Sequence, residues 1–165
     1  MPWIFWDASA LAKRYAPEPG TSLVNEAFHL LVPSRMIFSR MGILEIICLL
    51  VRKRNDGRLT QVLFDQAMMA FSAEITNSPD MNLAAIDDTL IVSALPLIEV
   101  HNLNASDAVV LRLAMDLEGH LRLSGDHLSL WSADKRLIRA AKNEGLIPFD
   151  PEAETLANLK QMLGV

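Results

Sequence analysis

The sequence predicts a three-layer α/β/α domain around a central parallel sheet of four or five strands. Short apolar runs rich in aromatic and β-branched residues alternate with longer amphipathic stretches, which is typical of βαβ units. The length of 165 residues suits one domain, and no repeat or linker divides it, so we expect a single domain over residues 1–165. An apolar fraction of 51% is too high for a disordered chain.

The first half of the chain predicts two strands separated by helices. Residues 3–6 form a buried strand, because four aromatic or β-branched side chains stand together before Asp7. A helix over residues 8–16 follows and stops at the break Pro17-Glu18-Pro19-Gly20. The next predicted elements are a helix over 21–31, a strand over 36–39, and helices over 42–55 and 59–77.

The second half continues the alternation and completes the sheet. Strands are predicted over 83–86, 127–132 and 146–149, and Pro148 places the last one at an edge of the sheet. Asp87 and Asp88 cap a helix that runs toward residue 101 with Pro96 inside it. Further helices are predicted over 104–118 with Gly119 as the stop, over 134–144, and from residue 150 onward.

Composition excludes several classes of site. The single cysteine, Cys48, excludes a disulfide framework and a cysteine-built zinc site, and we expect it to be a small buried apolar residue. The four histidines show no metal-binding spacing. The longest apolar run, residues 43–51, is far shorter than the roughly 18–20 residues of a membrane span, and no signal peptide is visible. We therefore expect a cytoplasmic protein, with a mean hydropathy of +0.22 that favours a buried partner surface.

The net charge of −5 argues against general affinity for nucleic acid, which needs a positive surface. The positive residues are clustered, however, most densely in Arg52, Lys53, Arg54 and Arg58. Such residues complement the dipole at the end of a helix, or they contact an RNA backbone or an acidic partner segment. Lys13, one to two helical turns beyond Asp7, is a candidate for contact with a substrate phosphate.

Three aspartates stand where a helix begins, and two of them directly follow strands. Each of Asp7, Asp107 and Asp134 alone suits an ordinary helix cap. Because residues that follow parallel strands meet at one edge of the sheet, Asp7 and Asp134 are expected to lie there together. Glu45 lies in a helix that is apolar on every face, so we expect it to be buried and neutralised by a proton, an arginine or a metal ion.

Four carboxylates at one edge would repel each other unless cations lay between them. Mg²⁺ and Mn²⁺ bind oxygen ligands, and a pair of such ions is the usual arrangement for in-line hydrolysis of a phosphodiester bond. The pattern therefore predicts a metal-dependent phosphodiesterase site.

The motifs around these acids resemble the PIN-domain family of metal-dependent ribonucleases, and within it the VapC-like toxins of toxin–antitoxin pairs. The resemblance rests on residues 7–13 with 17–20, residues 39–45 with 56–59, residues 103–108, and residues 131–137 with 140–141 and 145–146. These short motifs follow one another in the family's order over about residues 4–149.

The resemblance implies that Asp7, Glu45, Asp107 and Asp134 form the catalytic, metal-binding set for Mg²⁺ or Mn²⁺. It also implies that hydroxyls at Ser9 and Ser132 orient the first and fourth carboxylates, a typical supporting role around a metal. The implied activity is endoribonuclease cleavage of RNA by a homodimer that a small antitoxin holds inactive. The sequence departs from the family at Arg112, where a small residue is usual, and in the long stretch 121–130.

Two other functions compete with this interpretation, and a third, that of a phosphatase, is disfavoured at one position. One is a catalytically silent PIN-like protein that acts only by binding a partner. The other is a phosphoacceptor receiver-type domain, which needs a second acid beside Asp7, where the chain has Trp6 and Ala8, and a late lysine. A phosphatase of the haloacid dehalogenase type needs a second aspartate at the position of Ser9.

Overall fold

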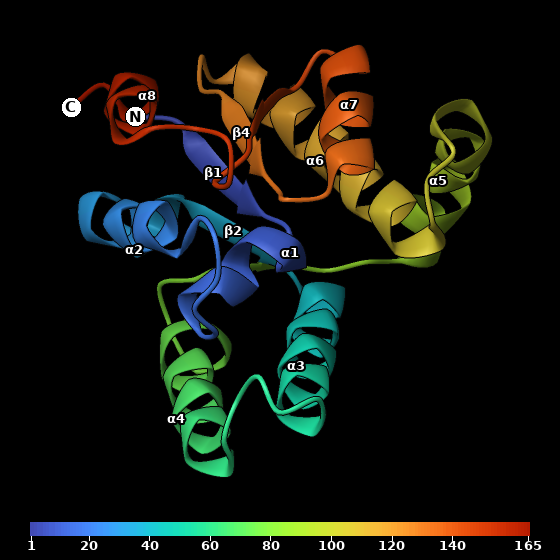
Figure 1. Ribbon diagram of the computed structural model, residues 1–165. Coiled ribbons are helices and arrows are strands. Elements are labelled where there is room, and N and C mark those ends of the chain that lie inside the picture. The colour runs from blue at the N-terminus through green and yellow to red at the C-terminus, as the bar shows by residue number, and fades with distance from the viewer.

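The computed structural model of the protein describes residues 1–165 and contains one sheet of five parallel strands. The strands lie in the order β3-β2-β1-β4-β5, with helices on both faces (Figure 1). This confirms the predicted three-layer α/β/α fold, including the edge position of the strand that contains Pro148. The strands are β1 (Trp3–Trp6), β2 (Met36–Ser39), β3 (Asn82–Ala84), β4 (Leu128–Trp131) and β5 (Ile147–Phe149).

Eight α-helices connect and cover the strands. They are α1 (Ala8–Leu11), α2 (Thr21–Leu30), α3 (Arg40–Asn55), α4 (Gln61–Phe71), α5 (Asp88–His101), α6 (Ala105–Leu123), α7 (Lys135–Asn143) and α8 (Leu156–Leu163). Shorter 3₁₀ turns cover Ala12–Arg14 and Pro33–Arg35, and a π-helical turn over Ser72–Thr76 extends α4. None of these helices has the length and apolar character that a bilayer crossing requires.

The helix predicted over 8–16 is α-helical only to Leu11 and continues as a 3₁₀ turn to Arg14. Two further predicted helix boundaries were wrong. Helix α6 does not stop at Gly119 but continues to Leu123, because Gly119 adopts ordinary helical angles there and only raises the cost of helix formation. The left-handed residue that turns the chain toward β4 is Gly125. The last helix begins at Leu156, capped by Thr155, whereas residues 151–153 form a turn.

The side chains of the central strands alternate between two hydrophobic cores. From β1, Ile4 and Trp6 enter the core beneath α1, α2, α3 and α8, while Phe5 enters the core beneath α5, α6 and α7. Trp131 stacks on Phe149 with ring centroids 4.1 Å apart and contacts Trp6 at 4.6 Å. These tryptophans are therefore core residues, and packing in the two cores holds β1 and β4 in their register.

The first turn of helix α3 packs closely against strand β2 at Gly42. A Cβ atom on Gly42 would lie 2.6 Å from Cε2 and 2.7 Å from Cζ of the buried Phe38 ring. We therefore expect Gly42→Ala to destabilise the fold by about 1–3 kcal/mol in urea unfolding, the usual cost of overpacking. Gly119→Ala is the matched control, because its Cβ would meet nothing, and it should stabilise the fold by about 1 kcal/mol. Equal effects of the two substitutions would contradict this account.

Candidate functional site

The carboxyl ends of β1 and β4 lie side by side and place two aspartates at one edge of the sheet. Trp6 pairs with Trp131 in the parallel register, and the Asp7 backbone N–H donates to the Trp131 carbonyl at 2.9 Å. Asp7 caps α1, and Asp134 caps α7 by accepting hydrogen bonds from the backbone N–H groups of the first turn. Both aspartates thus serve as helix caps, and the fold also brings them to the same edge.

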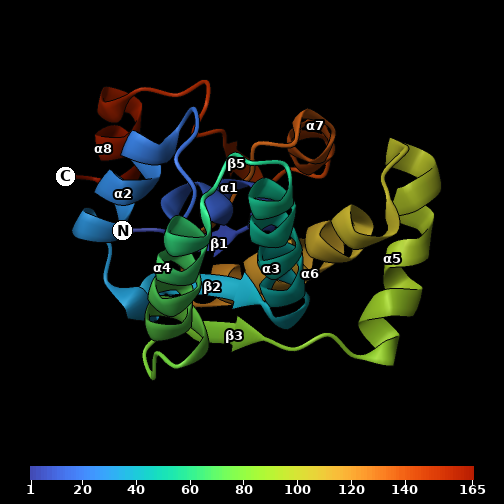
Figure 2. The same ribbon diagram turned by 60° about the horizontal axis from the view of Figure 1, so that its bottom comes forward.

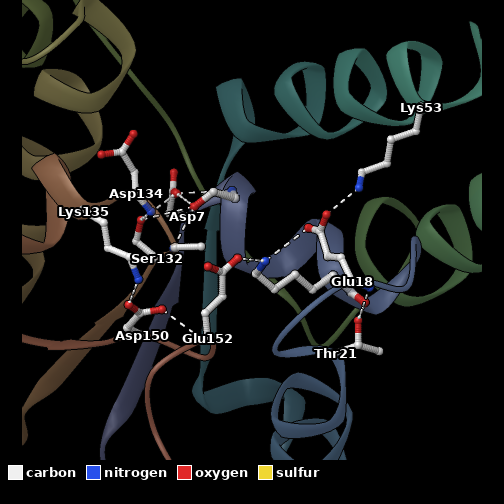
Figure 3. Close-up of polar contacts among 12 residues, drawn as sticks. Asp7, Glu18, Thr21, Lys53, Ser132, Asp134, Lys135, Asp150 and Glu152 are labelled. Carbon is white, nitrogen blue, oxygen red and sulfur yellow. Dashed lines mark hydrogen bonds and ion pairs between the residues drawn. The ribbon is translucent and has the colours of Figure 1, made fainter. Parts of the chain in front are cut away.

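Two serine hydroxyls connect the β1 and β4 turns, and Figure 3 shows one of them, that of Ser132, beside Asp7. Oγ of Ser9 and Oγ of Ser132 both donate to Oδ2 of Asp7, the second at 3.0 Å. Oγ of Ser9 accepts from the Ala133 backbone N–H at 2.9 Å, and Oγ of Ser132 accepts from the Asp134 N–H at 3.0 Å. The serines therefore orient the Asp7 carboxylate directly, whereas Ser132 holds Asp134 through its backbone alone.

One surface hollow is lined by all four predicted carboxylates. We call it the carboxylate hollow: it has a volume of about 310 Å³ and is lined by Asp7, Glu45, Asp107 and Asp134 together with Ser9, Arg52 and neighbouring residues. These acids come from the end of β1, from α3, from the start of α6 and from the start of α7. The fold thus brings together the set that the sequence singled out.

The charges in the carboxylate hollow affect one another. Burial, together with the negative charges of Asp7, Asp134 and Glu45, raises the pKa of Asp107 to about 7, and the charge of Arg136 opposes this rise. Burial also raises the pKa of Asp7, and the hydrogen bonds from Ser9 and Ser132 lower it by a smaller amount. The hollow is therefore a place where negative charge lacks compensation.

Two observations bear on whether the residues fit a metal ion. Oδ2 of Asp107 is buried without a hydrogen-bond partner, and unprotonated carboxylates are the ligands that Mg²⁺ and Mn²⁺ prefer. Against this, no three acid, histidine or cysteine side chains meet closely enough to form a ready-made metal cage. Like charges separate when no cation lies between them, so such spacing is expected for carboxylates that share one hollow and raise the pKa of Asp107. The donor set fits a divalent cation.

The expectation that Glu45 lies in a helix buried on all sides was wrong. Helix α3 buries only one face, with Ile46 and Leu50, whereas Leu44 is 65% exposed and Cys48 is exposed to solvent. Glu45 is half-buried, and burial raises its pKa, partly offset by a hydrogen bond from Ser106 and reinforced by the charge of Asp7. No arginine contributes to that shift, so Glu45 is not the buried Glu–Arg pair that the sequence left open.

Lys13 lies deeper than the sequence suggested. Its side chain is 2% exposed, and Nζ lies 2.6 Å from Oε1 of Glu152 and 3.2 Å from Oε1 of Glu18. Oε2 of Glu18 also accepts a hydrogen bond from Nζ of Lys53 at 2.5 Å. A substrate phosphate would have to compete with two carboxylates for Lys13. Sequence reasoning missed this network, since nothing in the sequence links Lys13 to a residue 139 positions away.

Because Lys13 is buried between two carboxylates, we expect Lys13→Met to destabilise the protein by about 3 kcal/mol, the cost of leaving buried charges unpaired. Urea unfolding measures this loss. Lys142→Met, which changes a solvent-exposed lysine of α7, is the control and should cost less than about 0.5 kcal/mol. If Lys13→Met left stability unchanged, the ammonium would be free for a ligand after all.

The two departures from the family pattern lie outside the carboxylate hollow. Arg112 pairs with Asp116 one turn further along α6 and does not line the hollow. Within 121–130, the first three residues extend α6, and β4 begins at Leu128, whose N–H donates to the buried Glu118 at 2.6 Å. The long stretch is therefore used to lengthen α6.

Comparisons with known proteins identify the fold. No protein-family model and no curated protein sequence matches the chain. Among solved structures, PAE2754 from Pyrobaculum aerophilum is 16% identical with a TM-score of 0.62, covering 99% of this chain and 98% of that one. FitAcB from Neisseria gonorrhoeae is 13% identical with a TM-score of 0.59, over 92% and 99%. A toxin–antitoxin complex from Klebsiella pneumoniae is 15% identical with a TM-score of 0.53, over 90% and 97%. At these identities the likeness concerns the fold alone.

Proposed function

We propose that the protein is a Mg²⁺- or Mn²⁺-dependent endoribonuclease of the PIN type and the toxin of a toxin–antitoxin pair. The observation that carries the proposal is the carboxylate hollow, where four acids from four separate segments face one space. Burial and the three neighbouring negative charges raise the pKa of Asp107, and the charge of Arg136 offsets only part of this rise, which favours a cation in the hollow. The similar structure of a Klebsiella pneumoniae toxin–antitoxin complex supports the toxin role.

In this proposal the four carboxylates hold the cation and position an attacking water. Bound Mg²⁺ or Mn²⁺ would activate that water and stabilise charge on the phosphate. Asp7 and Asp107 would be the principal ligands, while Glu45 and Asp134 would complete the set and orient the water. Ser9 and Ser132 fix the direction of the Asp7 carboxylate. Water would attack phosphorus and release a 5′-phosphate and a 3′-hydroxyl.

We further propose that the toxin acts as a cytoplasmic homodimer inhibited by a small antitoxin. The exposed apolar residues support a partner surface, since isolated soluble domains expose few contiguous apolar patches. Several of them lie together on α5, which packs on α6 and stands out at the side of the molecule (Figure 2). They are Ile91, Val92, Leu95 and Val100.

Calorimetric titration with Mn²⁺, paired with an RNA cleavage assay, tests the proposal against a catalytically silent protein. We expect Mn²⁺ to bind the wild-type protein and to support cleavage, and both to be lost in Glu45→Gln. A protein that binds no Mn²⁺ and leaves RNA intact would be a partner-binding member of the same fold.

A further inference from the structure

A second hollow adjoins the carboxylate hollow. It has a volume of about 370 Å³ and is lined by four cationic side chains and three carboxylates. We call it the basic hollow after its cations, which are Lys13, Arg52, Lys53 and Arg58; the carboxylates are Glu18, Asp134 and Glu152. The two hollows share part of their walls, namely Ser9, Leu49, Arg52 and Asp134. An extended ligand in the carboxylate hollow can therefore continue into the basic hollow.

Three of the four cations in the basic hollow are already paired with acids. Lys13 pairs with Glu18 and Glu152, Lys53 pairs with Glu18, and Arg58 pairs with Asp56. Arg52 forms no ion pair, and its only hydrogen bond is a weak one of 3.4 Å from Nε to the Cys48 carbonyl. Arg52 is thus the one cation of this hollow whose charge is free for a ligand.

Arg52 is also aligned with the carboxylate hollow. It lies seven residues after Glu45 on α3, which places both side chains on one face of the helix, two turns or roughly 10 Å apart. It is exposed, and it lines both hollows. A guanidinium at this place can bind a phosphate in two-pronged fashion while the next phosphate lies among the carboxylates.

Building on the proposed ribonuclease activity, we propose that Arg52 binds the phosphate next to the scissile one in single-stranded RNA, and that the basic hollow is the path of the strand beyond the cleavage site. An RNA strand is favoured over an acidic protein segment because the free guanidinium lies on the wall shared with the carboxylate hollow. An RNA strand that is cut in the carboxylate hollow must extend beyond it. The basic hollow offers such a path, with the unpaired charge of Arg52 on its wall.

The first test measures binding without cleavage. A fluorescein-labelled single-stranded oligoribonucleotide is titrated by anisotropy with Asp7→Asn protein over a range of salt concentrations. Adding Arg52→Ala should weaken binding about 10-fold and lower the slope of log K against log salt by about 0.7, the release expected for one phosphate contact. Arg52→Lys should restore the slope and part of the affinity. Arg54→Ala, on the same helix but lining neither hollow, is the matched control.

The second test measures cleavage of two substrates. On a long RNA, Arg52→Ala should raise KM about 10-fold with little change in kcat, whereas on a dinucleotide, which has only the scissile phosphate, it should change neither. Equal losses on both substrates, or no loss on the long one, would overturn the assignment and leave the ribonuclease proposal intact. Polyglutamate, used as a probe for an acidic protein segment, gives the alternative outcome. If Arg52→Ala lost polyglutamate binding but kept RNA binding, Arg52 would be assigned to an acidic protein partner instead. If the wild-type protein neither binds nor cuts RNA, both proposals fail.

Discussion

Asp7→Asn is expected to lower RNA cleavage by roughly 10²–10³-fold, the loss typical of removing one preorganised charged group from an active site. Asp7 is the most enclosed of the four acids, and its carboxylate is oriented by two hydroxyls. Asparagine keeps the shape and the ability to cap α1 but carries no negative charge. The rate of single-turnover cleavage in Mg²⁺ measures the effect.

A control separates loss of charge from loss of fold. Asp65→Asn makes the same chemical change on the exposed surface of α4, outside the carboxylate hollow, and should leave cleavage unaltered. Circular dichroism should show Asp7→Asn to be folded, because the cap at α1 survives. Undiminished cleavage by folded Asp7→Asn protein would remove Asp7 from the proposed catalytic set.

The metal-free protein should be more stable at pH 5 than at pH 8. The pKa of Asp107 rises from 3.8 to about 7 on folding, so between these values the folded state binds more protons than the unfolded state. The contribution of Asp107 to stability is therefore fully present below about pH 4 and is lost as the pH rises through 7. The full shift corresponds to about 4 kcal/mol, which solvent screening at this half-buried group reduces to about 2 kcal/mol.

Thermal unfolding in EDTA measures this loss as a fall in Tm of about 5 °C between pH 5 and pH 8. Asp107→Asn should make Tm nearly independent of pH over this range. The substitution leaves the N-cap of α6 in place, because Asn104 provides that cap. The ion-paired Glu18 and Glu74 have lowered pKa values and finish titrating below this range, so they do not reverse the trend. Added Mn²⁺ should restore stability at pH 8 by binding the folded state. A Tm that rises with pH in EDTA would contradict the proposed charge repulsion.

Much of the fold could be predicted because local patterns and the sheet agree. Runs such as residues 3–6 and 36–39 are apolar on both faces, as strands covered on two sides must be, and the breaks between them contain proline or glycine. The prediction failed at Gly119, where a local stop signal lost to the tertiary contacts that keep α6 helical up to Leu123. Local signals of this kind are weak compared with packing.

The candidate site was predictable to the extent that parallel topology determines it. Asp7 and Asp134 follow neighbouring strands, so their proximity follows from the sheet. The position of Glu45 depends on which face of α3 packs against the body, and the apolar sequence around it did not reveal that face. The partners of Lys13 could not be predicted, because Glu152 reaches it from the far end of the chain and no local pattern links residues so distant in sequence.

The pairing of β1 with β4 brings Ser132 to Asp7, and these residues, which are 125 positions apart in the sequence, form a hydrogen bond. While a ribosome is still synthesising the chain, the segment that carries Ser132 and Asp134 emerges late, and contacts so distant in sequence form slowly. A nascent polypeptide lacking that segment has only one of the two hydroxyls that orient Asp7, and it lacks Asp134. The carboxylate hollow is therefore complete only after this late segment has paired with β1.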